Sequence, residues 1–145
     1  MAKRSILLVA TVAVLMTLIG ATAQKAATAA APLPFSAARR AGATLYVSGQ
    51  VARTPSGQSI HDSIEAETRQ VMENIGKVLK DNGYGFNDVV NATVYLAVMD
   101  DYAAMNQVYA SYFTNGFPAR ACVGGVKLVS GFKVEISCIA YKTGE

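Results

Sequence analysis

The sequence predicts an α+β domain in which two helices pack on one face of a sheet. Apolar residues recur at helical spacing over residues 63–81, and β-branched residues alternate over residues 89–96. A second helical pattern follows, and two alternating runs, residues 118–123 and 132–140, close the chain. The predicted order is therefore one or more strands, then helix, strand, helix, strand, strand. At 145 residues, the chain is long enough for one domain with its own core.

The first 23 residues have the layout of a secretory signal peptide. A basic head with Lys3 and Arg4 precedes fourteen uncharged residues, 6–19, and a small-x-small cleavage pattern at residues 21–23. The apolar run is short for a membrane span, which needs about 20 residues. We therefore expect residues 1–23 to be removed and the protein to be secreted or periplasmic. A membrane anchor formed by an uncleaved signal is the second interpretation, and a mitochondrial presequence is the third.

Charge and composition argue against several classes of site. Cleavage would leave 11 of the 13 basic side chains against 10 acidic ones, a net charge of +1. No dense stripe of lysine or arginine remains, so we expect no nucleic-acid partner. The chain has one histidine, His61, and two cysteines, and this set predicts neither a zinc site nor a histidine-based triad.

The chain after the signal begins with a linker and a strand. Residues 24–33 are rich in alanine and predict a linker, so the folded domain should span residues 34–143. The first strand signal is residues 45–48, which Gly49 closes. Turn-forming residues follow at 54–57.

The helix over residues 63–81 has recognisable ends. Asp62 followed by Glu65 has the spacing of a capping box, and Asn82 with Gly83 is a typical stop. Its buried face is predicted from side chains at helical spacing, namely Ile64, Thr68, Val71, Ile75, Val78 and Leu79.

A second helix is expected after Asp100 and Asp101, which predict its N-terminal cap. Phe117 and Pro118 end it. Its stripe at helical spacing consists of Tyr102, Met105, Tyr109 and Tyr112. We interpret this stripe as core rather than as a surface for a cofactor.

Two charged residues stand in the apolar closing strands. Arg120 is the only arginine after Arg69, and Glu135 is the only acid between Asp101 and Glu145. Charges on mostly buried strands need a partner or a use. If the two strands are adjacent, alternation places Arg120 and Glu135 on one face, as a fork for a carboxylate beside a group that can hold a water. A purely structural pair that joins two strands or two subunits is the alternative.

The two cysteines lie in the same closing strands. Cys122 shares the parity of Arg120, and Cys138 lies on the face opposite Glu135. We therefore expect the two thiols to point to different sides and to remain free, with Cys138 a small core residue. Cys122 is either an inert buried thiol or a redox-sensitive one.

Three segments resemble one known family in sequence and order. They are residues 42–50 (GATLYVSGQ), 117–123 (FPARACV) and 134–136 (VEI). Further matches are Glu67 to Gln70 with Asn74, Asp88 to Val94, and Asn106 followed by Tyr109. Over about residues 34–141 the chain is similar to the Rid family, the YjgF-type reactive intermediate deaminases.

The resemblance implies a fold and a reaction. The implied fold is a chorismate-mutase-like mixed sheet with two helices on one face, assembled as a homotrimer with ligand clefts between subunits. The implied activity is hydrolysis of 2-imino or enamine acids, such as 2-iminobutanoate and 2-iminopropanoate, to 2-oxo acids and ammonia without a cofactor or metal. No membrane partner is implied once the signal is cleaved.

The resemblance also assigns roles to residues. Arg120 would bind the substrate carboxylate, and Glu135 would orient a water or accept its proton. Further substrate-binding positions are Gly49 and Cys122 through their backbone groups, Asn106 in the cleft wall, Ser48 and Phe35. Ser48 has the alternative of simply ending a strand.

The chain departs from the family pattern at three places. Phe35 stands where a tyrosine is usual, Gly124 and Gly125 replace a Glu-Val pair and predict a bulge, and Ser137 replaces an acid. These changes keep a second hypothesis open, an exported non-catalytic trimeric module that binds small carboxylates. The ribonuclease function once attributed to the family is a third, which the net charge disfavours.

Overall fold

The computed structural model describes residues 33–143, which form seven regular elements. In chain order they are β1 (Ala38–Ala41), β2 (Thr44–Val51), α1 (Ile64–Asp81), β3 (Val89–Leu96), α2 (Tyr102–Ala110), β4 (Ala119–Gly124) and β5 (Val134–Tyr141). The predicted signal peptide, residues 1–23, and the predicted linker up to residue 32 lie outside the described residues. None of the helices in the described part is both long and apolar enough to cross a membrane.

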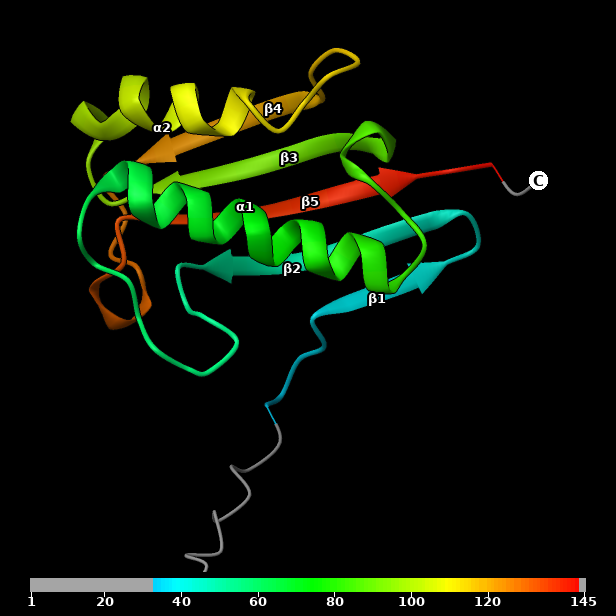
Figure 1. Cartoon of the computed structure of the whole chain (residues 1–145), viewed down its shortest axis with the longest axis horizontal. Helices are drawn as coiled ribbons and strands as arrows, with labels where there is room; N and C mark the ends of the chain where they lie inside the picture. Colours follow the sequence, from blue (N-terminus) through cyan, green and yellow to red (C-terminus); the bar gives the residue numbers. More distant parts are fainter. Residues whose placement is uncertain (1–32, 144–145) are drawn as a thin grey trace, which may run out of the picture. The chain divides into compact units, whose positions relative to one another are not determined.

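The five strands form one mixed sheet in the order β1-β2-β5-β3-β4. All neighbouring pairs are antiparallel except β3 and β4, which are parallel. Figure 1 shows α1 lying across β5 and β2, with α2 beside β4 and β3. Residues of both helices join those of the strands in one core, so the prediction of two helices on one face of a mixed sheet is confirmed.

Alternation gives the sheet two different faces. On β5, Val134, Ile136 and Cys138 are buried beneath the helices, while the residues between them are only partly buried. On the edge strand β4, Ala119 and Val123 are exposed. We call the side without helices the open face.

Helix α1 matches the prediction within one residue, but its cap is different. The N-cap is Ser63, whose hydroxyl accepts a hydrogen bond from the Ala66 amide at 3.2 Å. The predicted capping box at Asp62 and Glu65 is therefore wrong, because the extended backbone that a cap needs occurs one residue later. The predicted Thr68 is buried and donates to the Ile64 carbonyl at 2.7 Å.

Helix α2 is shorter than its stripe suggested, since it ends at Ala110. Met105 and Tyr109 lie in the core as predicted, whereas Tyr102 is exposed. Asp101 occupies the N-cap position, but its side chain makes no capping hydrogen bond, so that part of the prediction is wrong.

Strand β1 was not expected, because Arg39 and Arg40 carry no strand signal. Tertiary contacts stabilise it. The Arg40 guanidinium lies 5.1 Å from the centre of the Tyr84 ring and donates to the Asn82 carbonyl. The Tyr84 hydroxyl in turn donates to the Ala43 carbonyl at 3.0 Å, so the β1–β2 turn is held against the end of α1.

The predicted bulge does not include Gly124. β4 pairs with β3 in regular register up to Gly124. A side chain on Gly124 would collide with that of Met99, so this glycine serves close packing instead. The irregularity lies in β2, where the register with β5 shifts between Val47 and Gln50.

The cap assignment is testable by substitution. Ser63→Ala should lower the free energy of unfolding by about 1 kcal/mol, because one amide of the first turn of α1 loses its acceptor. Asp62→Ala should cost less than half of that, since Asp62 contributes only to the helix dipole. Urea unfolding of both variants measures the difference. A larger loss for Asp62→Ala would contradict Ser63 as the cap.

Candidate functional site

Arg120 lies on edge strand β4 with its side chain on the helix-covered face. Its guanidinium carbon is 4.7 Å from the centre of the Tyr109 ring and 5.7 Å from that of Tyr102. One nitrogen, Nη2, donates to the Tyr102 hydroxyl at 3.3 Å. Both rings come from α2, two helical turns apart. Cation–π contacts therefore hold the guanidinium in place, and among the described residues most of its N–H donors form no hydrogen bond.

A cleft of about 400 Å³ opens beside this guanidinium. It is lined by Asn106, Tyr109, Ala110, Phe117, Pro118 and Arg120. The structure thus brings together two sequence-predicted residues, Arg120 and Asn106, from a strand and a helix. The walls are otherwise mainly apolar, as is typical of a pocket for a small ligand.

Within residues 33–143, no carboxylate pairs with Arg120. The ion pairs there are Lys77–Asp81 and the contact between His61 and Glu67. The alternative that Arg120 and Glu135 form a structural pair within one chain is therefore wrong. The planar guanidinium of Arg120 lies at a cleft and pairs with no carboxylate of the described residues. It is therefore available to bind the carboxylate of a ligand.

Glu135 lies on the other face of the sheet. β3 separates β4 from β5, so the two closing strands are not adjacent. Arg120 pairs with Ala92 of β3, and Glu135 pairs with Tyr95. Paired residues share a face, and Ala92 and Tyr95 have opposite parity. The prediction that Arg120 and Glu135 share a face is wrong, because alternation could not reveal the intervening strand.

Glu135 packs instead against Gly49, at the irregularity in β2. A methyl group on Gly49 would collide with Oε1 of Glu135, so only glycine leaves room for the carboxylate there. The neighbouring Ser48 hydroxyl donates to the Ser36 carbonyl at 2.6 Å, which ties β2 to the chain just before β1. Phe35, next to Ser36, has 61% of its surface exposed.

The predicted site residues therefore fall into two groups. Arg120, Asn106 and Cys122 belong to the β4 side. Glu135 and Gly49 belong to the β2–β5 side, and Ser48 and Phe35 lie at β2 and just before β1. Tyr102 and Tyr109 were expected only as core, although they flank Arg120. Their spacing on one helix face, two turns apart, was the available signal.

Both cysteines lie on the helix-covered face, opposite Val94 and Ala92 of β3. The expectation that they point to different sides is wrong, but both are free, as predicted. Burial raises the pKa of the Cys138 thiol to about 12. Burial also raises the pKa of Cys122, although Arg120 partly opposes it. Neither thiol is an activated nucleophile.

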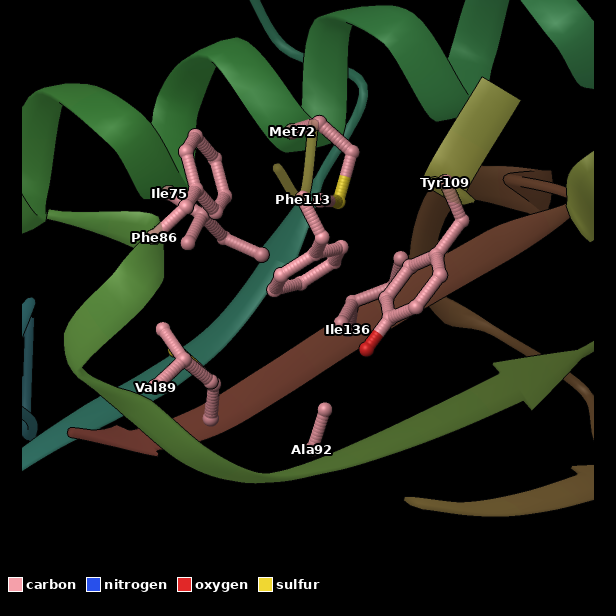
Figure 2. A pocket seen from close by; sticks show the side chains of 9 residues that line it. Met72, Ile75, Phe86, Val89, Ala92, Tyr109, Phe113 and Ile136 are labelled. Atoms are coloured by element: carbon pink, nitrogen blue, oxygen red, sulfur yellow. The ribbon is translucent and has the colours of Figure 1, made fainter. Parts of the chain in front are cut away.

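Tyr109 connects the cleft to the core. Burial raises the pKa of its phenol to about 12, against the opposing effect of Arg120, so the phenol is neutral. Figure 2 shows its ring pointing into a small apolar cavity beside Ile136 and Ala92. This cavity, about 10 Å³, is no larger than the space that one water needs. It belongs to the packing of the helices on the sheet. No group of three potential metal ligands occurs within residues 33–143.

Comparison with known proteins gives concordant matches. The family model described as "Endoribonuclease L-PSP" matches residues 24–142. A RutC family protein of Pyrococcus horikoshii is 44% identical over 110 residues, which cover 75% of this chain and 87% of that protein. The 2-iminobutanoate/2-iminopropanoate deaminase of Mus musculus is 42% identical over 108 residues, covering 74% of this chain and 80% of the mouse protein.

A solved structure shows the same fold. The crystal structure of E. coli TdcF with bound serine is similar with a TM-score of 0.73 at 27% sequence identity. The match covers 78% of this chain and 91% of the TdcF chain.

The raised thiol pKa values predict resistance to alkylation. At pH 8, iodoacetamide should leave Cys138 of the native protein unmodified and should modify Cys122 more slowly than a free cysteine, because a thiol with a raised pKa stays neutral until the pH is higher. Mass spectrometry of the peptides measures both. Protein unfolded in urea is the control, in which both cysteines should react fully. Rapid modification of native Cys138 would contradict its burial.

Proposed function

This chain belongs to the Rid family of reactive intermediate deaminases, and we propose that it hydrolyses 2-imino or enamine acids to 2-oxo acids and ammonia. The single observation that carries the proposal is the guanidinium of Arg120, which faces a cleft without a carboxylate partner among the described residues. The name of the mouse relative, a 2-iminobutanoate/2-iminopropanoate deaminase, supports the same reaction.

Arg120 binds the carboxylate of the substrate in this proposal. A guanidinium offers two parallel N–H donors that match a planar carboxylate. The rings of Tyr102 and Tyr109 restrain the guanidinium before the substrate arrives, so less side-chain entropy is lost on binding. TdcF, whose structure contains serine, binds a molecule with the same carboxylate group.

We propose that each complete site forms between two subunits of a homotrimer. Arg120 and Glu135 lie on opposite faces of one sheet, so one chain cannot direct both to the same substrate. The open face carries exposed side chains of Tyr46, Val123 and Tyr141, which favour association with other copies of the chain. Glu135 of one subunit would then complete the Arg120 cleft of the next.

The chemistry needs one water and no cofactor. Glu135 orients the water and accepts its proton as oxygen attacks the carbon of the C=N bond. The same carboxyl group returns that proton to nitrogen, which gives a carbinolamine. Glu135 then moves the proton of the carbinolamine hydroxyl to the nitrogen, so the C–N bond breaks and ammonia leaves as the C=O bond forms. Gly49 leaves the space that Glu135 occupies. In this proposal, its backbone groups would contact the water. Imines hydrolyse readily in water, so positioning can supply most of the acceleration.

Phe35 favours a second candidate, a trimer that binds small carboxylates without turnover. It stands where the family pattern has a tyrosine, so a phenol hydroxyl is missing beside the site. In that case 2-oxo acids would bind saturably through Arg120, and imines would hydrolyse at the uncatalysed rate. We propose no ribonuclease activity, since the net charge after cleavage of the signal would be only +1.

We also propose that the protein is exported. The proposal is supported by the basic head, the apolar run of residues 6–19 and the small residues at 21–23. The substrates would then be imino acids outside the cytoplasm.

The carboxylate grip is tested with Arg120→Ala. An amino-acid oxidase generates the imine, semicarbazide traps what remains, and the rate of imine loss is measured. Because the substitution removes the hydrogen bonds between Arg120 and the charged substrate carboxylate, kcat/KM should fall by about 100-fold, which corresponds to about 3 kcal/mol. Arg69→Ala, which removes an exposed arginine of α1, is the matched control and should keep the wild-type rate. An unchanged rate of imine loss in Arg120→Ala would contradict the proposal that Arg120 binds the substrate.

The shared site is tested by mixing two inactive variants. Arg120→Ala and Glu135→Gln are unfolded together and refolded as mixed trimers. If each cleft takes its arginine from one subunit and its glutamate from the next, about a quarter of the clefts regain both residues, and activity returns to about that level. Each variant refolded alone is the control. Mixed trimers no more active than these controls would show that the two residues do not cooperate across subunits.

A further inference from the structure

Glu67 is a buried carboxylate that the proposed chemistry does not use. Its side chain is 0% exposed, and the one other buried polar residue among those described is its neighbour Thr68. Thr68 satisfies its hydroxyl within α1, whereas Glu67 reaches out of the helix to another part of the chain. A fully buried carboxylate is unfavourable unless its contacts compensate, so these contacts indicate its role.

The contacts of Glu67 converge on the start of β5. Oε2 accepts a hydrogen bond from the Lys133 amide at 2.7 Å. Oε1 makes no hydrogen bond within the described residues, and it faces Nδ1 of His61 at 3.7 Å. The His61 ring stacks on Phe132, with the ring centres 4.8 Å apart. Glu67 and His61 therefore hold two consecutive residues just before β5.

Residues 132 and 133 lead into β5 and so influence the position of Glu135. The Lys133 carbonyl accepts from the Ala97 amide at 2.9 Å, so the peptide groups on both sides of Lys133 are held, one by α1 and one by the segment after β3. Glu135 follows two residues later, as the second residue of β5. Glu135 also pairs with Val51 of β2, just beyond the irregularity in that strand. The hydrogen bonds at Lys133 therefore hold the backbone that leads directly into Glu135.

We infer that Glu67, supported by His61, is a positioning residue for Glu135. It acts through the Lys133 amide, the adjacent backbone and the first residues of β5, and it touches no substrate. The inference rests on the proposed function, because it assigns Glu135 to the reaction. The side-chain contacts of Arg120 are with Tyr102 and Tyr109 of α2 and with none of these groups, so binding of the substrate carboxylate does not depend on this anchor.

Among the described residues, His61 provides the side-chain contact of Glu67 outside α1. Charged residues close in sequence to these contacts are Arg53 and Asp62 on the loop, Glu65 and Arg69 on α1, and Lys133 at the start of β5. Arg53 lies against the Phe132 ring, 6.0 Å from its centre, and forms no ion pair with Glu67. Within residues 33–143, His61 is the basic side chain that reaches Glu67, with Nδ1 3.7 Å from Oε1.

The test compares three variants of the full trimer with wild type. Glu67→Leu keeps the volume but removes the acceptor for Lys133, and its kcat should fall about tenfold with KM unchanged, since a misplaced catalytic group loses turnover while the Arg120 grip persists. Glu67→Gln keeps an acceptor oxygen and should retain most of the wild-type kcat. Thr68→Val, at an equally buried neighbour with no link to β5, is the matched control.

A spectroscopic readout accompanies the kinetics. In the ¹⁵N-labelled protein, the amide resonance of Glu135 should move in Glu67→Leu and stay in place in Thr68→Val. Full kcat and an unmoved Glu135 resonance in Glu67→Leu would overturn the inference and leave Glu67 a structural residue. A rise in KM at unchanged kcat would also overturn it.

Two results need separate treatment. If wild type hydrolyses no imine, the proposed function fails, and the Glu135 resonance alone decides whether Glu67 positions β5. If Glu67→Leu does not fold, His61→Phe takes its place, because it preserves the stack on Phe132 and removes only the ring nitrogen that faces Glu67. It should then lower kcat and move the Glu135 resonance, and a wild-type result in both would overturn the inference.

Discussion

The order of the strands is the constraint on which the site depends. β3 lies between β4 and β5, and paired residues share a face, so Arg120 goes with Ala92 and Glu135 with Tyr95. A shift of either strand by one residue would turn its side chains over. The helices prevent this shift for β5. They cover its side chains at positions 134, 136, 138 and 140, which are all apolar, and a shift would bury the partly polar side chains of the other face instead. The core thus determines on which face each charge lies.

The helix-covered face tolerates Arg120 because α2 supplies aromatic rings where the edge strand lacks a further neighbour. A guanidinium is weakly hydrated and stacks on tyrosine, so Tyr102 and Tyr109 replace part of the water that it loses. Lysine would gain less from the same surroundings, since its compact charge is strongly hydrated. Tyr102 and Tyr109 lie on the same face of α2. Tyr109 packs in the core, and both rings flank Arg120 at the cleft.

Periodicity predicted α1 and β3 closely because each is long and buries one consistent set of side chains. It could not predict which strands are neighbours, and the shared face of Arg120 and Glu135 failed for that reason. β1 was not predicted because it is stabilised by tertiary contacts, such as the stacking of Arg40 on Tyr84, and not by local strand propensity. Burial of Glu67 was equally hidden, since its partner, the amide of Lys133, lies 66 residues away.

Arg120 and Glu135 lie on opposite faces of the sheet, so the proposed reaction would need more than one copy of the chain. The tyrosine and the thiols near Arg120 are neutral, because burial raises the pKa of Tyr109, Cys122 and Cys138. Among the described residues of one chain, the cleft would then offer a site for a carboxylate but no base, and Glu135 would lack a bound substrate. In the proposed trimer, assembly would bring the two together and exclude bulk water from the cleft at the same time. The proposed imine hydrolysis would need little more than this pairing, so the subunit interface would be the main element of catalysis.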